Sequence, residues 1–293
     1  MLDNFEKIEF FKQSINDSLE KYIPKDNKLI TEAMRYSLFA GGKRIRPILT
    51  LAFCEACSSD YIIALPFGCS VEMIHTYSLI FDDLPCMDND ILRRGKPTNH
   101  MIYGENISLM AGSSLYSLAI DIILNASVEK LSINQIIEGL KILISASGKD
   151  GIIQGQVLDI LNIDKKILLQ NELENIYELK TVALIEASVL LGCLAAQVDM
   201  KYYEAASVYA KNIGMAFQIR DDILDVVGDV NFVGKSVGKD IKENKVTFVD
   251  LLGVEGSQNK VDEYINNAIG SLEIFNNNDF LIYLTKSLCN RNK

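Results

Sequence analysis

The chain has 293 residues, 48% of them hydrophobic, which is enough for the buried core of one large domain or two small ones. Its formal net charge of −10 would repel a polyanion over most of the surface, so we expect no nucleic-acid partner. The first residues lack the basic start and apolar run of a signal peptide, and no long apolar stretch is free of charge. We therefore expect a cytoplasmic protein without stable membrane insertion.

The cysteines and histidines argue against a disulfide framework and against a zinc site. The six cysteines have no framework spacing, and Cys54-x-x-Cys57 has no second pair. Because the only histidines are His75 and His100, a zinc site is not expected.

The predicted secondary structure is helical throughout. All prolines lie before Thr98, so nothing after it interrupts a helix. Apolar residues recur at three- and four-residue spacing among many Ala, Leu, Glu and Lys residues. Helices are expected, in chain order, over residues 29–40, 66–83, 106–125, 131–147, 172–198 and 201–227. With glycines at the helix ends, no linker and no strand-helix alternation, the sequence predicts one all-α domain, residues 1–293.

The first of two acidic clusters, Asp82, Asp83 and Asp88, ends the helix over 66–83. Asp82 and Asp88 are six residues apart, or about 240° round a regular helix, so they cannot face the same way if the helix continues. Pro85 ends or bends the helix, which lets Asp88 fold back towards Asp82.

The second cluster lies on the helix over 201–227. Gln218, Asp221, Asp222 and Asp225 stand at i, i+3, i+4 and i+7 and so share one face. An apolar stripe is expected beside them, made of Ile219, Ile223 and Val226. Like charges on a packed helix repel, and Mg²⁺, which takes oxygen ligands, would relieve this repulsion. A solvated acidic face is the alternative, but the presence of two such clusters favours a metal.

Basic residues beside glycines provide cations for a phosphate group. They lie in segments 41–47, 93–97, 180–181 and 234–239. None fits a phosphate-binding loop, and no dinucleotide-binding Gly pattern follows a strand, so nucleotide-binding folds are disfavoured.

These features occur as seven ordered motifs that span nearly the whole chain. They are Gly41-Gly-Lys-Arg-Ile-Arg-Pro47, Asp82-Asp-Leu-Pro-Cys-Met-Asp-Asn-Asp90, Leu92-Arg-Arg-Gly-Lys-Pro-Thr-Asn-His100, Gly155-Gln-x2-Asp159, Lys180-Thr181, Phe217-Gln-x2-Asp-Asp-x2-Asp225 and Gly234-Lys-x2-Gly-Lys239. With them the chain resembles the trans-isoprenyl diphosphate synthases, most closely the short-chain enzymes of the farnesyl and geranylgeranyl type.

The resemblance implies a helical bundle around a deep central cavity, usually in a homodimer, with the acidic motifs on opposite walls. About three Mg²⁺ ions would hold an allylic diphosphate, which ionises before isopentenyl diphosphate attacks the allylic cation. The released diphosphate would take the final proton. The implied metal ligands are Asp82, Asp88, Asp221, Asp222 and Asp225, and the implied catalytic residues are Asp82, Asp83, Asp88, Asp221, Asp222 and Lys180.

The resemblance also assigns the diphosphate-binding residues. Isopentenyl diphosphate would bind Lys43, Arg46, His75 and Arg94. The allylic diphosphate would bind Arg93, Lys180, Thr181, Gln218, Lys235 and Lys245.

Product length is expected to depend on Tyr77 and Ser78, which precede Asp82 on the same helix. In similar bacterial enzymes an aromatic residue five positions before the first aspartate, with the insertion Pro85-Cys86, accompanies a fifteen-carbon product. This favours farnesyl diphosphate; if Tyr77 is only core packing, geranylgeranyl diphosphate is the alternative.

Some residues depart from the family pattern, and other functions are open. Ser113 stands at a usual Asp, Val182 at a usual small residue, and Asn89 at a frequent Asp. Class I terpene cyclases share the fold but normally lack both the second motif in this form and the segment 41–47. A catalytically silent subunit of a heteromeric synthase is disfavoured because both acidic motifs are retained. A magnesium-binding scaffold is a further alternative, which absence of magnesium-dependent binding of a diphosphate analogue would favour.

Overall fold

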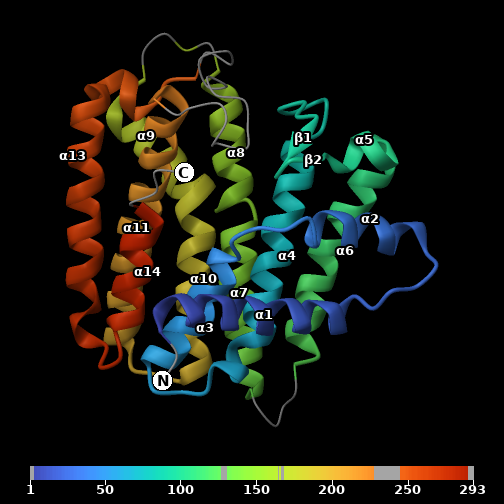
Figure 1. Cartoon of the computed structure of the whole chain (residues 1–293), viewed down its shortest axis with the longest axis horizontal. Coiled ribbons are helices and arrows are strands. Elements are labelled where there is room, and N and C mark those ends of the chain that lie inside the picture. The colour runs from blue at the N-terminus through green and yellow to red at the C-terminus, as the bar shows by residue number, and fades with distance from the viewer. Residues whose placement is uncertain (1–2, 127–130, 164, 166–167, 228–244, 290–293) are drawn as a thin grey trace.

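The computed structural model describes residues 3–126, 131–163, 165, 168–227 and 245–289, and it is almost entirely helical (Figure 1). The elements are α1 (Asn4–Tyr22), α2 (Leu29–Leu38), α3 (Ile45–Ala56), η1 (Tyr61–Ala64), α4 (Leu65–Asp82), β1 (Leu92–Arg93), β2 (Lys96–Pro97), α5 (Asn99–Tyr103), α6 (Glu105–Leu124), α7 (Ile133–Ser147), α8 (Ile152–Leu161), α9 (Gln170–Tyr177), η2 (Glu178–Val182), α10 (Ala183–Ala196), α11 (Met200–Val227), α13 (Phe248–Ser271), η3 (Leu272–Ile274) and α14 (Asp279–Cys289). The prediction of a single all-α domain is confirmed.

The predicted helices agree with the structure to within about two residues at most ends. The helix predicted over 172–198 is the continuous run of α9, η2 and α10, in which η2 is a π-helical segment. The hairpin of β1 and β2 was not predicted. Its turn residues Arg94 and Gly95 both have positive φ, as a two-residue type I′ turn requires. The sequence does not predict this turn, because arginine is not among the residues preferred in it.

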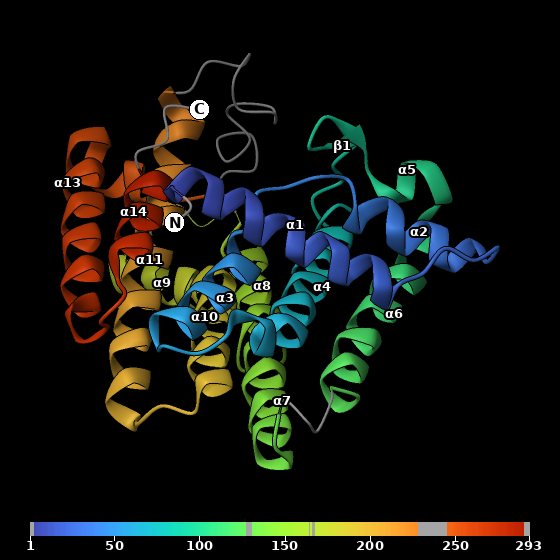
Figure 2. The same cartoon turned by 60° about the horizontal axis from the view of Figure 1, so that its bottom comes forward.

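Helix α10 runs through the middle of the bundle (Figures 1 and 2), where it packs against α3, α4, α7 and α11. It is apolar on all sides, as expected of a helix that is surrounded by protein. Gly192 lets it approach α3 closely, because a Cβ at this position would overlap the carbonyl oxygen of Thr50. The site elements α4, η2 and α11 are therefore held around a rigid central helix.

Among the described residues, three helical segments are long and apolar enough to cross a membrane, judged by length and composition only. They are Tyr61–Asp82, Glu105–Leu124 and Gln170–Ala196, and 56%, 39% and 61% of their apolar windows are buried inside the bundle. The second segment, α6, is therefore the least buried of the three.

Candidate active site

The first acidic cluster forms where α4 stops at Asp82. The backbone N–H of Asp88 donates to the carbonyl oxygen of Asp82 at 2.9 Å, and Asn89 adopts φ +49° as the chain turns. The predicted return of Asp88 towards Asp82 is confirmed. Burial raises the pKa of Asp82 to about 6; the charge of Lys180 opposes this rise, and that of Asp88 adds to it. Lys180 on η2 therefore lies within electrostatic range of Asp82.

Asp83 has a different environment from its neighbour. It is buried and accepts a hydrogen bond of 2.6 Å from Nε of Arg93, whose guanidinium also lies 3.4 Å from Asp90. The pKa of Arg93 is raised: burial would lower it, but the contact with Asp83 outweighs burial. The structure thus uses Asp83 and Arg93 to hold the hairpin against the end of α4.

The N-terminus of α3 is fixed on α4 by a buried ion pair. Arg44 has φ +52° and binds Glu72 at 2.6 Å and the carbonyl oxygen of Leu38 at 2.6 Å. This anchoring places Nη1 of Arg46, the second residue of α3, 3.4 Å from Nε2 of His75. Glu72 was not singled out by sequence reasoning, because a carboxylate inside an apolar helix looks like an ordinary solvated residue.

Arg46, His75 and Arg94 form a positively charged corner. Arg94 donates to the carbonyl oxygen of Gly41, and a Cβ at Gly42 would lie 2.7 Å from its guanidinium carbon. Burial lowers the pKa of Arg46 to about 10, and burial together with neighbouring arginines holds the pKa of His75 well below its usual value. Lys43 is exposed on the same turn.

One atom of this corner lacks a partner among the described residues. Nε of Arg46 is buried without a hydrogen bond. Buried donors are almost always paired, so this one suits an anionic ligand that would complete it.

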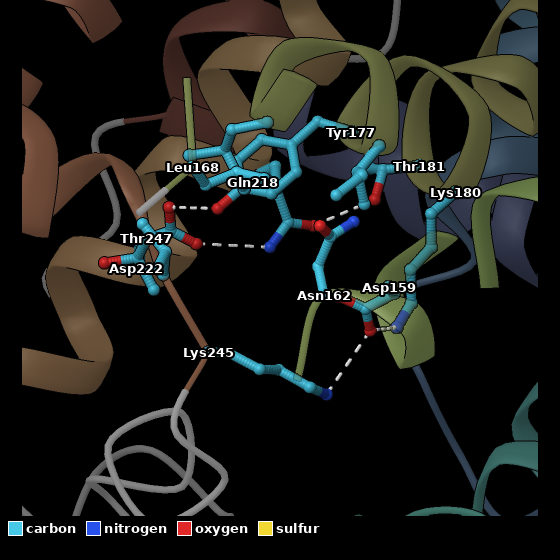
Figure 3. A pocket seen from close by; sticks show the side chains of 13 residues that line it. Asp159, Asn162, Leu168, Tyr177, Lys180, Thr181, Gln218, Asp222, Lys245 and Thr247 are labelled. Carbon is cyan, nitrogen blue, oxygen red and sulfur yellow. Dashed lines mark hydrogen bonds and ion pairs between the residues drawn. The ribbon is translucent and has the colours of Figure 1, made fainter. Parts of the chain in front are cut away.

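The second acidic cluster divides into two environments on the unbroken helix α11. Asp221 is exposed, and its charge is one of those that act on Arg46. Asp222 is only 2% exposed: Oδ2 accepts from the Tyr177 hydroxyl at 2.6 Å (Figure 3) and from the backbone N–H of Phe248 at 3.2 Å. The side-chain amide of Gln218 donates to Oδ1 at 3.3 Å.

Gln218 and Asp222 share a face as predicted, since they are one turn apart and hydrogen-bonded to each other. The carboxylate of Asp222 is nevertheless buried against Tyr177 of α9 and Phe248 of α13, whereas that of Asp221 is exposed. Asp225 is half-buried on the same helix. The expected apolar stripe is also incomplete, since Ile219 and Ile223 are buried but Val226 is 43% exposed.

Two lysines meet at Asp159 on α8 (Figure 3). Nζ of Lys180 lies 2.6 Å and Nζ of Lys245 3.3 Å from Oδ2 of Asp159. Burial alone would raise the pKa of Asp159, but the two lysines together lower it. Nearby, the hydroxyl of Thr181 donates to Gln218 at 2.8 Å. The predicted residues Lys180, Thr181, Gln218 and Lys245 thus line one pocket.

A glycine makes this arrangement possible. A Cβ at Gly155 of α8 would overlap the backbone nitrogen of Lys180, so only glycine allows α8 to approach η2 this closely. The sequence indicates Asp159 only as part of the motif Gly155-Gln-x2-Asp159, and it gives no signal for Tyr177. Lys235 lies outside the described residues.

The two residues expected to limit product length are both on α4. The ring of Tyr77 contacts Phe81 at 4.7 Å and Tyr116 at 5.3 Å between centroids. The hydroxyl of Ser78 donates to the carbonyl oxygen of His75 at 2.9 Å, within its own helix. Of these two residues, Tyr77 therefore has the bulky side chain that contacts a neighbouring helix.

The unusual residues Ser113 and Val182 do not face the lysine pocket. Ser113 is exposed on α6 and donates to the carbonyl oxygen of Leu109. Val182 is buried, and its Cγ2 would lie 2.8 Å from a Cβ at Gly214 of α11. The larger residue after Lys180-Thr181 is matched by a glycine opposite.

Comparisons with known proteins agree over nearly the whole chain. The family model of polyprenyl synthetase matches residues 27–278. The chain is 41% identical over 283 residues to the geranylgeranyl diphosphate synthase of Cyanophora paradoxa, covering 96% of this chain and 94% of that protein. It is 41% identical over 268 residues to the farnesyl diphosphate synthase of Bacillus subtilis (strain 168), covering 90% of each. The crystal structure of geranylgeranyl pyrophosphate synthetase from Pyrococcus horikoshii Ot3 superimposes with a TM-score of 0.91 at 29% identity, covering 99% of this chain and 98% of that one.

Proposed function

Because the chain belongs to the polyprenyl synthetase family and is a short-chain trans-prenyltransferase, we propose that its main product is farnesyl diphosphate. The family implies isopentenyl diphosphate and an allylic diphosphate as substrates. For this chain the allylic substrate is dimethylallyl or geranyl diphosphate. The second candidate product is geranylgeranyl diphosphate, which is supported by a relative of that name at the same 41% identity.

The observation that carries the proposal is that each acidic cluster lies within electrostatic range of a cationic group. The charge of Lys180 acts on Asp82, and the charge of Asp221 acts on Arg46. Two diphosphates need two cationic sites that converge on one reaction space, which a cavity for a single anion does not provide. The retained acidic motif on α11 also favours a synthase over a terpene cyclase.

The family uses Mg²⁺ to bind diphosphate, and the carboxylates fit that ion. Among the described residues no three acidic, histidine or cysteine side chains lie close enough to hold a metal by themselves. This accords with magnesium, which is held by one or two carboxylates together with substrate phosphates. We assign Asp82, Asp88, Asp221 and Asp225 to about three ions, which would act as Lewis acids on the leaving diphosphate. Asp222 we assign to positioning, because its oxygens already accept hydrogen bonds.

The cations are divided between the substrates. The corner of Arg46, His75 and Arg94, with exposed Lys43, binds isopentenyl diphosphate. The buried Nε of Arg46 then donates a hydrogen bond to a diphosphate oxygen. Lys180, Thr181, Gln218 and Lys245 bind the allylic diphosphate with Lys235, and Asp159 aligns the two pocket lysines. Arg93 contributes at a distance, because its guanidinium is engaged by Asp83.

The chain itself supplies binding and orientation more than acid–base chemistry. His75 stays neutral near neutral pH because its pKa is depressed, so it donates or accepts a hydrogen bond without repelling a cationic intermediate. The two diphosphate sites hold the allylic carbon and the double bond of isopentenyl diphosphate together. The proton lost at the end passes to the departing diphosphate.

We further propose a homodimer whose interface is the apolar face of α6 and α7. Its exposed apolar residues are Leu109, Met110, Leu124, Ile133, Ile137 and Ile144. A face of this kind on a monomer marks an interaction site. A second copy is the occupant proposed here, because α6 is the least covered of the apolar helices.

We propose a cytoplasmic location without membrane insertion. Two of the three long apolar segments carry a charged residue that is ion-paired inside the bundle, Glu72 with Arg44 and Lys180 with Asp159, and such residues are rare and costly in a membrane-spanning helix. The cysteines whose side chains are described are free thiols, as in a reducing compartment.

The test is product analysis by mass spectrometry of the purified protein with isopentenyl diphosphate and dimethylallyl, geranyl or farnesyl diphosphate. We expect condensation with Mg²⁺, none in excess chelator, and farnesyl diphosphate as the main product. Tyr77→Ala should extend the product by at least one five-carbon unit. Geranylgeranyl diphosphate from the wild type would support the second candidate, and unchanged length in Tyr77→Ala would remove the steric role of Tyr77.

A further inference from the structure

Tyr77 is the centre of an aromatic group that spans α4 and α6. Its ring meets Phe81 at 64° and Tyr116 at 75° between planes, both edge-on arrangements that aromatic pairs favour. Phe81 and Tyr77 are one turn apart on α4, whereas Tyr116 comes from α6. The position of the Tyr77 ring is therefore set by a residue of a different helix.

Tyr116 is itself tied to a third helix. Its hydroxyl lies 3.3 Å from the hydroxyl of Ser147, which is fully buried at the end of α7. The raised pKa of Tyr77 has burial as its largest cause and Tyr116 as the next, which places the two phenols close together. Tyr77, Tyr116 and Ser147 thus form a continuous link across α4, α6 and α7.

The surroundings leave this link little room to shift on the side nearer Asp82. A Cβ at Gly112 of α6 would lie 2.8 Å from Cδ2 of Phe81 and 3.5 Å from Cδ2 of Tyr77. Gly112, which lies beside Phe81, is one turn before Tyr116, which lies beside Tyr77. Helices α4 and α6 therefore run antiparallel here. Tyr116 therefore contacts Tyr77 on the side away from Asp82.

A prenyl chain whose diphosphate is held at Asp82 and Lys180 meets this level as it grows inward. Tyr77 is five residues before Asp82, which is about 7.5 Å of helix rise. The bulk that stops the chain is then the linked pair of rings and not Tyr77 alone.

We propose that Tyr116 is a second chain-length residue, a positioning residue that holds the ring of Tyr77 across the path of the growing chain and is itself held by Ser147. The proposal rests on the proposed prenyl transfer. Loss of Tyr116 leaves space beside Tyr77 and lets its ring turn aside, so the chain gains room for a further unit.

The experiment measures product lengths from isopentenyl diphosphate and geranyl diphosphate with Mg²⁺, using full-length protein. In Tyr116→Ala the ratio of the next longer product to the wild-type product should rise about tenfold, the scale at which a pocket distinguishes small differences in apolar size. Tyr116→Phe and Ser147→Ala remove only the hydroxyl contact and should raise the same ratio less. The double variant Tyr116→Phe/Ser147→Ala should match either single one, because both remove the same bond.

Tyr61→Ala is the matched control. Tyr61 is also half-buried with two ring partners, Phe10 at 5.6 Å and Phe11 at 5.3 Å, but these belong to α1. It should keep the wild-type ratio.

The outcomes separate the two proposals. If Tyr77→Ala lengthens the product but none of the Tyr116 and Ser147 variants does, the role of Tyr116 is overturned while prenyl transfer stands. If Tyr116→Ala does not fold by circular dichroism, unchanged ratios in Tyr116→Phe and Ser147→Ala overturn it. If the wild type forms no prenyl product, the proposed function itself fails.

Discussion

Asp221 and Asp222 are adjacent residues whose carboxylates have opposite surroundings. Asp221 is exposed in the site, while Asp222 is buried and accepts hydrogen bonds from three donors. A carboxylate that binds metal needs open oxygens, and a buried carboxylate needs donors. The same residue type thus serves chemistry at one position and stability at the next.

Substituting each aspartate by asparagine should separate these roles. Asp221→Asn should lower kcat by at least about 100-fold while the free energy of unfolding stays within about 0.5 kcal/mol. Asp222→Asn should cost about 1–3 kcal/mol of stability, because the amide cannot accept at both oxygens. Urea denaturation and steady-state kinetics measure both. Equal stability of the two variants would contradict the structural role of Asp222.

Residue periodicity predicted the helix around Asp221 but not which carboxylate turns inward. That depends on Tyr177 and Phe248, which are 45 and 26 residues from Asp222 in the chain. The return of Asp88 was predictable, because it follows from the local effect of Pro85.

At the scale of elements, the π-helical segment η2 connects the pocket to the core. It presents Lys180 and Thr181 to the pocket and turns Val182 towards α11. Single π-helical turns inside α-helices are often found at functional sites. Gly214 leaves room for the valine at this crossing.

The fit of Val182 to Gly214 predicts a non-additive pair. Gly214→Ala should cost about 1–3 kcal/mol, because the new methyl group would lie 2.8 Å from Cγ2 of Val182. In a Val182→Ala background the same change should cost less, because the Cγ2 contact is gone while the contacts with Cα at 3.2 Å and Cβ at 3.3 Å remain, and the coupling should be about 1 kcal/mol. Denaturant unfolding of the four proteins measures this.

Gly270→Ala is the matched control for that cycle. Gly270 is in α13 and a Cβ there would meet nothing within 4 Å, so the substitution should stabilise by about 0.5–1 kcal/mol through helix propensity alone. Additive effects of the Val182 and Gly214 changes would show that the crossing tolerates the methyl group.

The six predicted helices agree with the structure in place and extent, since apolar spacing and glycines are local signals. Six further helices, α1, α3, α5, α8, α13 and α14, were not predicted. The hairpin of β1 and β2 and the π-helical η2 were also not predicted. The first depends on a positive φ at Arg94, and the second lies inside a pattern that reads as one regular helix.

For the whole molecule, the uncovered apolar face of α6 and α7 contrasts with a net charge of −10. Figure 2 shows both helices projecting at the bottom of the view. The charge keeps the protein soluble, but it does not cover this face. Burial of this face against a second copy removes apolar area from water, and this contributes a favourable free energy of about 25 cal/mol per Å² buried.

A charged residue on this face should therefore dissociate the dimer. Met110 on α6 is 60% exposed, and Met110→Glu places a carboxylate where two copies meet. By size-exclusion chromatography with light scattering at micromolar concentration, the wild type should show about twice the chain mass of 32.7 kDa, and the variant about the chain mass itself. Met200→Glu is the control, because Met200 is 70% exposed at the start of α11, outside the proposed interface, and its variant should remain dimeric. A wild type of single-chain mass would contradict the homodimer, and dissociation by both variants would contradict this location of its interface.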